Sequence, residues 1–174
     1  NGFQPDWSWV KNRNDVERHL LFDSVRGNTS MTDKFLVSDA TSAEGANGVT
    51  GTTVTVNADG MQIVESSIDS GELYFNSRTY VMWNWLAATA FSNDASATSV
   101  GTIDSSGRAN TTAGFSIVSY TGTGSAGTIK HGLSAAPEML IVKNRDSTRD
   151  WMIYHSALGA TKRIWLNYNL AQDS

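Results

Sequence analysis

The chain has 174 residues, a length that suits one ordinary domain, or one domain with part of another. Charged residues make up 17% of it and the formal net charge is −4, which argues against a basic nucleic-acid-binding surface. Hydrophobic residues make up 40%, with 6 Trp, 6 Phe and 5 Tyr, and only 2 Pro, so a collagen-like or disordered chain is excluded. The absence of cysteine excludes disulfides and thiolate chemistry. No apolar run approaches the roughly 18 residues of a membrane span, and the first residues do not form a signal peptide.

Short alternating strands dominate the predicted structure. Segments with β-branched and aromatic residues, separated by loops rich in Gly, Ser, Thr and Asn, are typical of an antiparallel sandwich. In chain order, strands are expected at residues 52–56, 61–65, 79–86, 114–120, 138–144, 151–155 and 163–169, with a hairpin turn at 57–60. We therefore predict an all-β fold with little helix, an antiparallel β-sandwich or jelly roll.

A segment near the N-terminus recurs 132 residues later. Residues 5–27 align without gaps with residues 137–159, and seven of the 23 positions are identical. A period of that length belongs to tandem domains and not to a short-repeat solenoid. Both copies are expected to form strand, loop and strand, ending at Gly27 or Gly159.

The repeat also predicts the domain organisation. Residues 88–112 carry no strong strand signal, so we place a module boundary there. Residues 1–112 are expected to be a first module that lacks its lead-in strand, and residues 113–174 the N-terminal part of a second module, as in a window of a longer array. Because such modules would expose unpaired edges, we expect neighbouring chains to complete them, most simply in a homo-oligomer.

Six sequence motifs lie within the two copies of the repeat or between them. They are FQPDWSWVKNR at 3–13, HLLFDSVRG at 19–27, YVMWNW at 80–85, AGFSIVSYTGTG at 113–124, HGL at 131–133 and YHSALG at 154–159. Together they resemble a module found in tandem in tailed-bacteriophage fibre-type proteins, except that Asn84 stands where those proteins tend to have Cys.

The resemblance implies a concanavalin A/laminin-G-like jelly roll and a structural or adhesive role on a phage virion, in a tail fibre or another surface appendage. Other virion proteins would be its partners, and a host-surface glycan its ligand. The resemblance carries over no catalytic residue, so we expect no enzyme. A secreted bacterial surface adhesin with lectin-like modules and a capsid decoration protein remain alternatives, because a cysteine-free, acidic chain of β-modules suits them also. A polysaccharide-cleaving enzyme rests only on the versatility of the fold.

The sequence contains fragments of cofactor and metal motifs, but each lacks the neighbouring structure or residue spacing that such a site requires. Residues 122–127 fit G-x-G-x-x-G, but a dinucleotide site needs a helix next, and residues 128–133 read as a strand. His19, His131 and His155 do not have the spacing of a zinc site. These features favour a flexible loop and structural histidines.

Acidic pairs could in principle serve a glycosidase. Glu65 with Asp69, and Asp94 with Asp104, are expected to be solvated loop carboxylates, because sequence gives no distance between them. Acidic loops also offer oxygen ligands to calcium, but no EF-hand-like spacing supports such a site. We predict no metal and no cofactor.

Interface candidates come from comparing the two copies. Lys11-Asn12-Arg13 recurs as Lys143-Asn144-Arg145. The favoured interpretation is structural, with Asn capping a turn while Lys and Arg pair with nearby acids. The alternative is a contact with an adjacent module or another chain.

Trp151 occupies the position of His19 in the other copy. A position that accepts His is less suited to a deep core, so Trp151 is the best candidate for an exposed ring that stacks on a sugar or meets a protein. Partial burial in the core is the other interpretation, and the favoured one.

Overall fold

The computed structural model describes residues 2–27, 31–32, 34–45, 52–65 and 77–173. These residues form an all-β, antiparallel sandwich structure with two short helical turns, as the sequence predicts. The elements are β1 (Trp7–Asn12), β2 (His19–Asp23), β3 (Met31–Thr32), β4 (Leu36–Val37), β5 (Thr52–Asn57), β6 (Gly60–Glu65), β7 (Tyr80–Trp85), β8 (Thr89–Asn93), α1 (Ala95–Thr98), β9 (Ser105–Asn110), β10 (Phe115–Tyr120), β11 (Met139–Val142), β12 (Met152–His155), η1 (Ser156–Leu158) and β13 (Ile164–Trp165). Among the described residues, no helix has the length and apolar character to cross a membrane.

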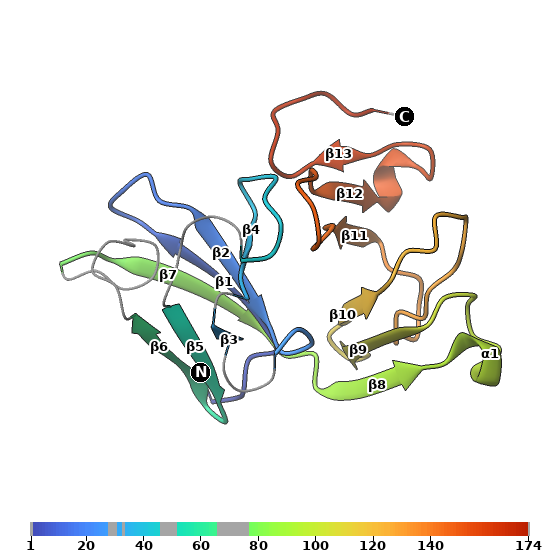
Figure 1. Cartoon of the computed structure of the whole chain (residues 1–174), viewed down its shortest axis with the longest axis horizontal. Helices are drawn as coiled ribbons and strands as arrows, with labels where there is room; N and C mark the ends of the chain where they lie inside the picture. Colours follow the sequence, from blue (N-terminus) through green and yellow to red (C-terminus); the bar gives the residue numbers. More distant parts are fainter. Residues whose placement is uncertain (1, 28–30, 33, 46–51, 66–76, 174) are drawn as a thin grey trace.

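The first sheet has the strand order β4-β2-β1-β7, and its inner face covers the β5–β6 hairpin (Figure 1). Alternation along each strand directs Val10, Leu20 and Phe22 to this face, where they pack with Val54 and Val56 of β5. The predicted hairpin is confirmed. Its strands pair from Thr52–Glu65 to Asn57–Gly60, which leaves a two-residue loop.

A second sheet, with the order β10-β9-β8, follows the first. The expectation that residues 88–112 contain no strong strand is therefore wrong. The strands β8 and β9 consist mostly of small and polar residues, and their pairing holds them in place. A Cβ atom on Gly107 would lie 2.3 Å from the carbonyl oxygen of Ile117 and 2.7 Å from the Phe91 ring, so only glycine allows this close packing.

The predicted boundary at 112/113 falls in the turn that joins β9 to β10. These two strands pair along their whole length, from Phe115–Asn110 to Tyr120–Ser105. The strand that we expected to lead into the second module is thus the last strand of the second sheet. The hydrogen-bonded pairing offers no support for a division at that point.

The third sheet, with the order β11-β12-β13, repeats three strands of the first. Trp7 opposite Asp23 becomes Met139 opposite His155, and Val10 opposite Leu20 becomes Val142 opposite Met152. The third strand also recurs, because β13 lies beside β12 as β4 lies beside β2, although it comes four residues earlier than the repeat would place it. The predicted common backbone of the two copies is therefore confirmed.

Details of the turns repeat as well. The amide of Ser24 donates to the carbonyl of Asp6 at 2.9 Å, and that of Ser156 donates to Glu138 at 2.7 Å. Asp23 Oδ1 accepts from the amide of Val25, and in the second copy His155 Nδ1 accepts from Ala157 in its place. A carboxylate and an imidazole thus serve the same turn.

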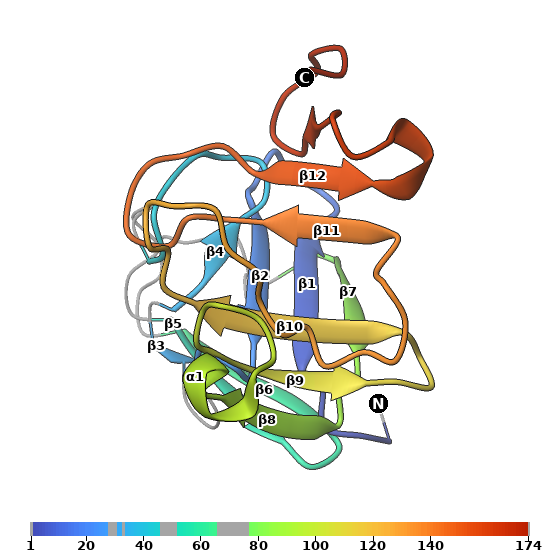
Figure 2. The same cartoon turned by 90° about the vertical axis from the view of Figure 1, so that its right-hand side faces the viewer.

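Figure 2 shows β8, β9, β10, β11 and β12 side by side, crossing β1 and β2 at a steep angle. The link between the layers is organised by Asp6, which is 1% exposed. Its carboxylate accepts from the amides of Ala87 and Ala88 at 2.8 Å each and from the hydroxyl of Ser24 at 2.7 Å. It also forms an ion pair with Arg108 of β9 at 2.8 Å. One buried carboxylate therefore joins the first sheet to the second.

Candidate binding surface

The outer face of the first sheet carries a cluster of tryptophans. Strand register sets Trp7 opposite Trp85 and Trp9 opposite Trp83, so all four side chains lie on the side away from the core. Their ring centroids are 4.5 Å apart in the first pair and 6.1 Å apart in the second. Phe115 of β10 stacks on Trp85 at 6.2 Å. We call Trp7, Trp9, Trp83 and Trp85 the aromatic face.

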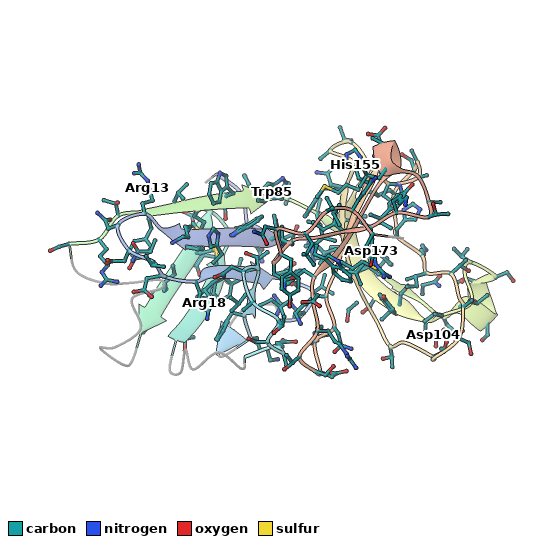
Figure 3. All side chains as sticks on the ribbon, turned by 90° about the horizontal axis from the view of Figure 1, so that it is seen from above. Arg13, Arg18, Trp85, Asp104, His155 and Asp173 are labelled. Carbon is teal, nitrogen blue, oxygen red and sulfur yellow. The ribbon has the colours of Figure 1, made fainter. Side chains whose placement is uncertain are left out.

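Only part of the aromatic face is open to solvent. Trp7 and Trp9 are half-buried, because they pack beside residues of the second copy. Trp83 is 45% exposed and Trp85 is 37% exposed. Figure 3 shows Trp85 on the first sheet, close to the second half of the molecule. The open part is therefore a pair of indole rings at alternate positions of β7, on the same face of the sheet.

Polar groups border these rings. The indole N–H of Trp9 donates to His19 Nδ1 at 3.1 Å, which requires that this nitrogen carry no proton. Partial burial lowers the pKa of His19, an effect that Lys11 reinforces and Asp39 opposes. The neutral imidazole thus fixes the orientation of the Trp9 ring.

Trp151 is not an exposed ring, so the structure overturns its candidacy as a surface stacking residue. It is 4% exposed and packs against Leu21 and Leu36 of the first copy. Its indole N–H is shared between the carbonyls of Val37 at 2.8 Å and Ala40 at 3.1 Å. Trp151 therefore joins the two copies, whereas its counterpart His19 bonds to Trp9 within its own sheet.

The two Lys-Asn-Arg corners form the same turn. Asn12 Oδ1 accepts from the amides of Asn14 and Asp15, and Asn144 Oδ1 accepts from those of Asp146 and Ser147. Each lysine also folds back onto the carbonyl of the asparagine that follows it: Lys11 does so at 2.7 Å and Lys143 at 2.8 Å. The capping role that we favoured for these asparagines is present in both copies.

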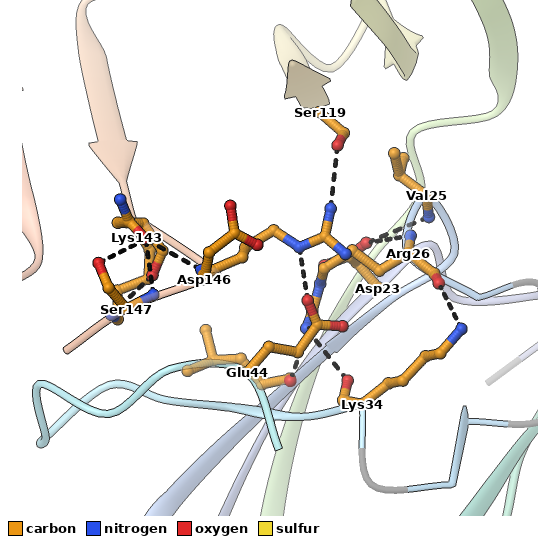
Figure 4. Close-up of polar contacts among 12 residues, drawn as sticks. Asp23, Val25, Arg26, Lys34, Glu44, Ser119, Lys143, Asp146 and Ser147 are labelled. Atoms are coloured by element: carbon orange, nitrogen blue, oxygen red, sulfur yellow. Dashed lines mark hydrogen bonds and ion pairs between the residues drawn. The ribbon is translucent and has the colours of Figure 1, made fainter. Parts of the chain in front are cut away.

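Beyond this turn, the two corners have different partners. Lys143 donates to the carbonyl of Thr41 at 3.1 Å, and burial lowers its pKa while Asp150 opposes that shift. Arg145 pairs with Glu44 and donates to Ser119 at 3.1 Å, and Figure 4 shows Glu44 and Ser119 on opposite sides of the contact. The second corner thus combines both interpretations: it pairs with an acid, and that acid belongs to the first copy.

The first corner makes local contacts. Lys11 donates to the carbonyl of Asp15 at 3.2 Å, within its own turn. The backbone amide of Arg13 donates to Thr79, while its side chain is exposed. Figure 3 places Arg13 at the end of the first sheet that is remote from the second half of the molecule.

The acidic pair Asp94 and Asp104 serves local structure. Asp94 Oδ1 accepts from the amides of Ser96 and Ala97 at 3.0 Å each and caps α1. The hydrogen bond from the Ser96 hydroxyl, above all, lowers the pKa of Asp94. Asp104 accepts from the amide of Ala95 at 2.8 Å. Asp69 lies outside the described residues, as does the side chain of Glu65.

The G-x-G-x-x-G match at 122–127 does not lie in a dinucleotide-binding structure. Residues 121–128 form an exposed loop with a short bend, and a bridge at Ile129 follows them where a dinucleotide site would need a helix. Within the described ranges, no group of three His, Asp or Glu side chains lies close enough together to hold a metal ion.

Sequence reasoning did not single out Trp83 and Trp85 as site residues. The strand predicted at 79–86 puts both on one face by alternation, but alternation alone does not tell which face is covered. The signal that was available was the register of two tryptophan-bearing strands, at 7–9 and 83–85, and it becomes visible only once these strands are paired.

Comparison with known proteins identifies a sequence family but no similar solved structure. No curated protein and no solved structure shows significant similarity to the chain. A family profile, described as a domain of unknown function (DUF7483), matches residues 1–174. The chain therefore belongs to the DUF7483 family.

Proposed function

We propose that the chain is a structural and adhesive component of a bacteriophage virion, in a tail fibre or another surface appendage, and that it attaches to host-surface glycan through Trp83 and Trp85. The virion role rests on the resemblance of the motifs at 3–13, 19–27 and 113–124 to fibre-type modules. The observation that carries the adhesive role is the pair of exposed indole rings on a paired strand.

The geometry suits a ligand with flat apolar faces and polar edges, as a pyranose has. Large exposed apolar groups on a folded surface mark an interaction site, and tryptophan combines a wide ring with an N–H donor. Trp9 and Phe115 pack against the exposed rings and restrict their rotation. Such pre-organisation reduces the entropy lost on binding.

A glycan-binding experiment tests the adhesive role. The chain would be applied to an array of bacterial surface polysaccharides, together with a Trp83→Ala/Trp85→Ala variant. We expect the variant to lose at least about tenfold in affinity, equivalent to about 1.4 kcal/mol. Tyr168→Ala is the matched control, because Tyr168 is 49% exposed and lies outside the aromatic face. Equal binding by the double variant and the control would reject glycan attachment through this face.

A second experiment tests the location. Gold-labelled antibody against the chain would be imaged on purified particles. Labelling of tail appendages supports the proposal, labelling of the head shell supports a capsid decoration protein, and labelling of bacterial surfaces without particles supports an adhesin.

A further inference from the structure

The first copy of the repeat shows which element covers a face that is exposed in the second copy. In the first copy, the inner face of β1, β2 and β4 is covered by the β5–β6 hairpin. Val10, Leu20 and Val37 on this face are 2%, 0% and 2% exposed. The hairpin supplies Val54 and Val56 as the opposing layer.

The equivalent face of β11, β12 and β13 is open. Strand register gives its members as Leu140, Val142, Met152, Tyr154 and Trp165, which we call the open face. Leu140 is 42% exposed and Met152 is 37% exposed, and the other three are half-buried. In the first copy, the counterparts of Val142 and Tyr154 are Val10 and Phe22, both of which are almost fully buried.

The open face does not result from a loose arrangement of the sheet. On the opposite face, Trp151 is 4% exposed and packs on Leu21 and Leu36 of the first copy, and Ile153 is 5% exposed, while Met139 and Ile141 on β11 are 49% and 42% exposed. The open face is also more apolar than its counterpart, because Leu140 takes the position of Ser8. Exposure of a contiguous apolar sheet face is unfavourable in water and marks a surface that is covered in the assembled protein.

We propose that the open face is the docking surface for a β-hairpin with the chemistry of Thr52–Glu65, supplied by a further repeat of the same family. The first copy identifies this occupant, because the same register positions, with the same or similar side chains, are covered there by such a hairpin. The hairpin would place alternate apolar side chains, like Val54, Val56 and Ile63, on Leu140, Val142 and Met152. Sheets that pack in this way have interdigitated side chains about 10 Å apart. This proposal does not depend on glycan binding.

The test supplies the hairpin to the whole chain. A second copy of residues 52–65 would be fused after Ser174 through a flexible Gly/Ser linker, which raises its effective concentration at the sheet to the millimolar range. Hydrogen exchange and binding of a hydrophobic dye would be measured. We expect at least tenfold slower exchange of the β11–β13 amides and a loss of dye fluorescence, relative to the unfused chain.

Three controls make the result decisive. A fusion with aspartate at the two positions that correspond to Val54 and Val56 should give no protection. Met152→Asp in the sheet should abolish protection by the original hairpin, whereas Met139→Asp should not, because Met139 is 49% exposed and points to the other face.

Absence of protection in the original fusion would overturn the proposal. It would also be overturned if the unfused chain sedimented as a dimer that Met152→Asp converted to a monomer, since the occupant would then be a second copy of this chain.

Discussion

The indole nitrogen of Trp151 donates a hydrogen bond of 2.8 Å to the carbonyl oxygen of Val37, 114 residues away in the sequence. One residue of the second copy is thereby inserted beside β4 of the first. The position equivalent to Trp151 in the first copy is His19, which bonds to Trp9 within its own sheet. The residue at this position therefore contacts the other copy where it is Trp151, and its own sheet where it is His19.

Replacing Trp151 should destabilise the fold strongly. We expect Trp151→Ala to lower the free energy of unfolding by about 3–5 kcal/mol, because it leaves a cavity among Leu21 and Leu36. Trp151→Phe should lose about 1–3 kcal/mol, because the ring remains but the N–H is lost. Urea denaturation measures both. Trp83→Ala is the control and should stay within about 1 kcal/mol, since Trp83 is 45% exposed. Equal losses at the two positions would contradict this role of Trp151.

The sequence was sufficient to predict the strands whose side chains alternate. The β5–β6 hairpin, β7 and the common register of the repeats follow from patterns of apolar residues and from the 132-residue offset. It was not sufficient for β8 and β9, because Ser105–Asn110 has little intrinsic preference for a strand. These strands form through neighbours that are distant in the sequence, such as Ile117 and Phe91 around Gly107.

The candidate site was harder to predict for a related reason. Alternation assigns residues to two faces but does not say which part of a face a later segment covers. Met139 and Ile141 match Trp7 and Trp9 in the repeat, and large apolar side chains in both copies are typical of a core, yet they are 49% and 42% exposed. Trp151, the best candidate for an exposed ring, is buried, as the favoured interpretation had it.

Asp6 should be the most sensitive charged residue of the described structure. Asp6→Ala would leave the amides of Ala87 and Ala88 without their acceptor and Arg108 without its ion pair. We expect a loss of about 3–5 kcal/mol in the free energy of unfolding, as when one partner of a buried pair is removed. Asp173→Ala is the matched control, because the Arg163–Asp173 pair is 41% and 54% exposed and should contribute about 1 kcal/mol or less. A loss at Asp6 as small as that at Asp173 would show that the junction does not depend on this carboxylate.

The two arginine corners offer a matched pair of substitutions. Arg145→Gln should weaken the contact between the copies by about 0.5–1 kcal/mol, because Arg145 pairs with Glu44 while remaining 41% exposed. Arg13→Gln, at the equivalent position with an exposed side chain, should leave the free energy of unfolding unchanged. A double-mutant cycle of Arg145→Gln with Glu44→Gln isolates the interaction. Additive effects in that cycle would mean that the pair does not contribute.

Alanine substitutions at Gly132 and Gly124 should distinguish the cost of steric crowding from the cost of backbone strain. Both have a left-handed backbone, with φ of +75° and +76°. A Cβ atom on Gly132 would lie 2.7 Å from the Phe91 ring and 2.9 Å from Ala109, whereas one on Gly124 would meet nothing within 4 Å. Gly124→Ala should therefore cost about 1 kcal/mol, for the backbone alone. Gly132→Ala should cost a further 1–3 kcal/mol or so for overpacking, measured by thermal or urea denaturation. Similar losses for the two variants would mean that Phe91 moves aside without cost.

Stability should depend on pH through His19. Burial lowers the pKa of His19 in the folded chain below 6.5, so between these two pKa values the unfolded chain binds more protons. The free energy of unfolding should therefore hold steady above about pH 6.5 and fall as the pH decreases below it, until the folded pKa is passed. Protonation of Nδ1 would also break the hydrogen bond from Trp9, and tryptophan fluorescence should report that change.

His19→Gln keeps an acceptor for the Trp9 N–H without a titrating ring, so its urea midpoint should change less between pH 7.5 and pH 5. His155→Gln serves as the comparison, since His155 accepts from Ala157 in its own turn. If His19→Gln and the unmodified chain lose stability equally over this range, another group must account for the loss.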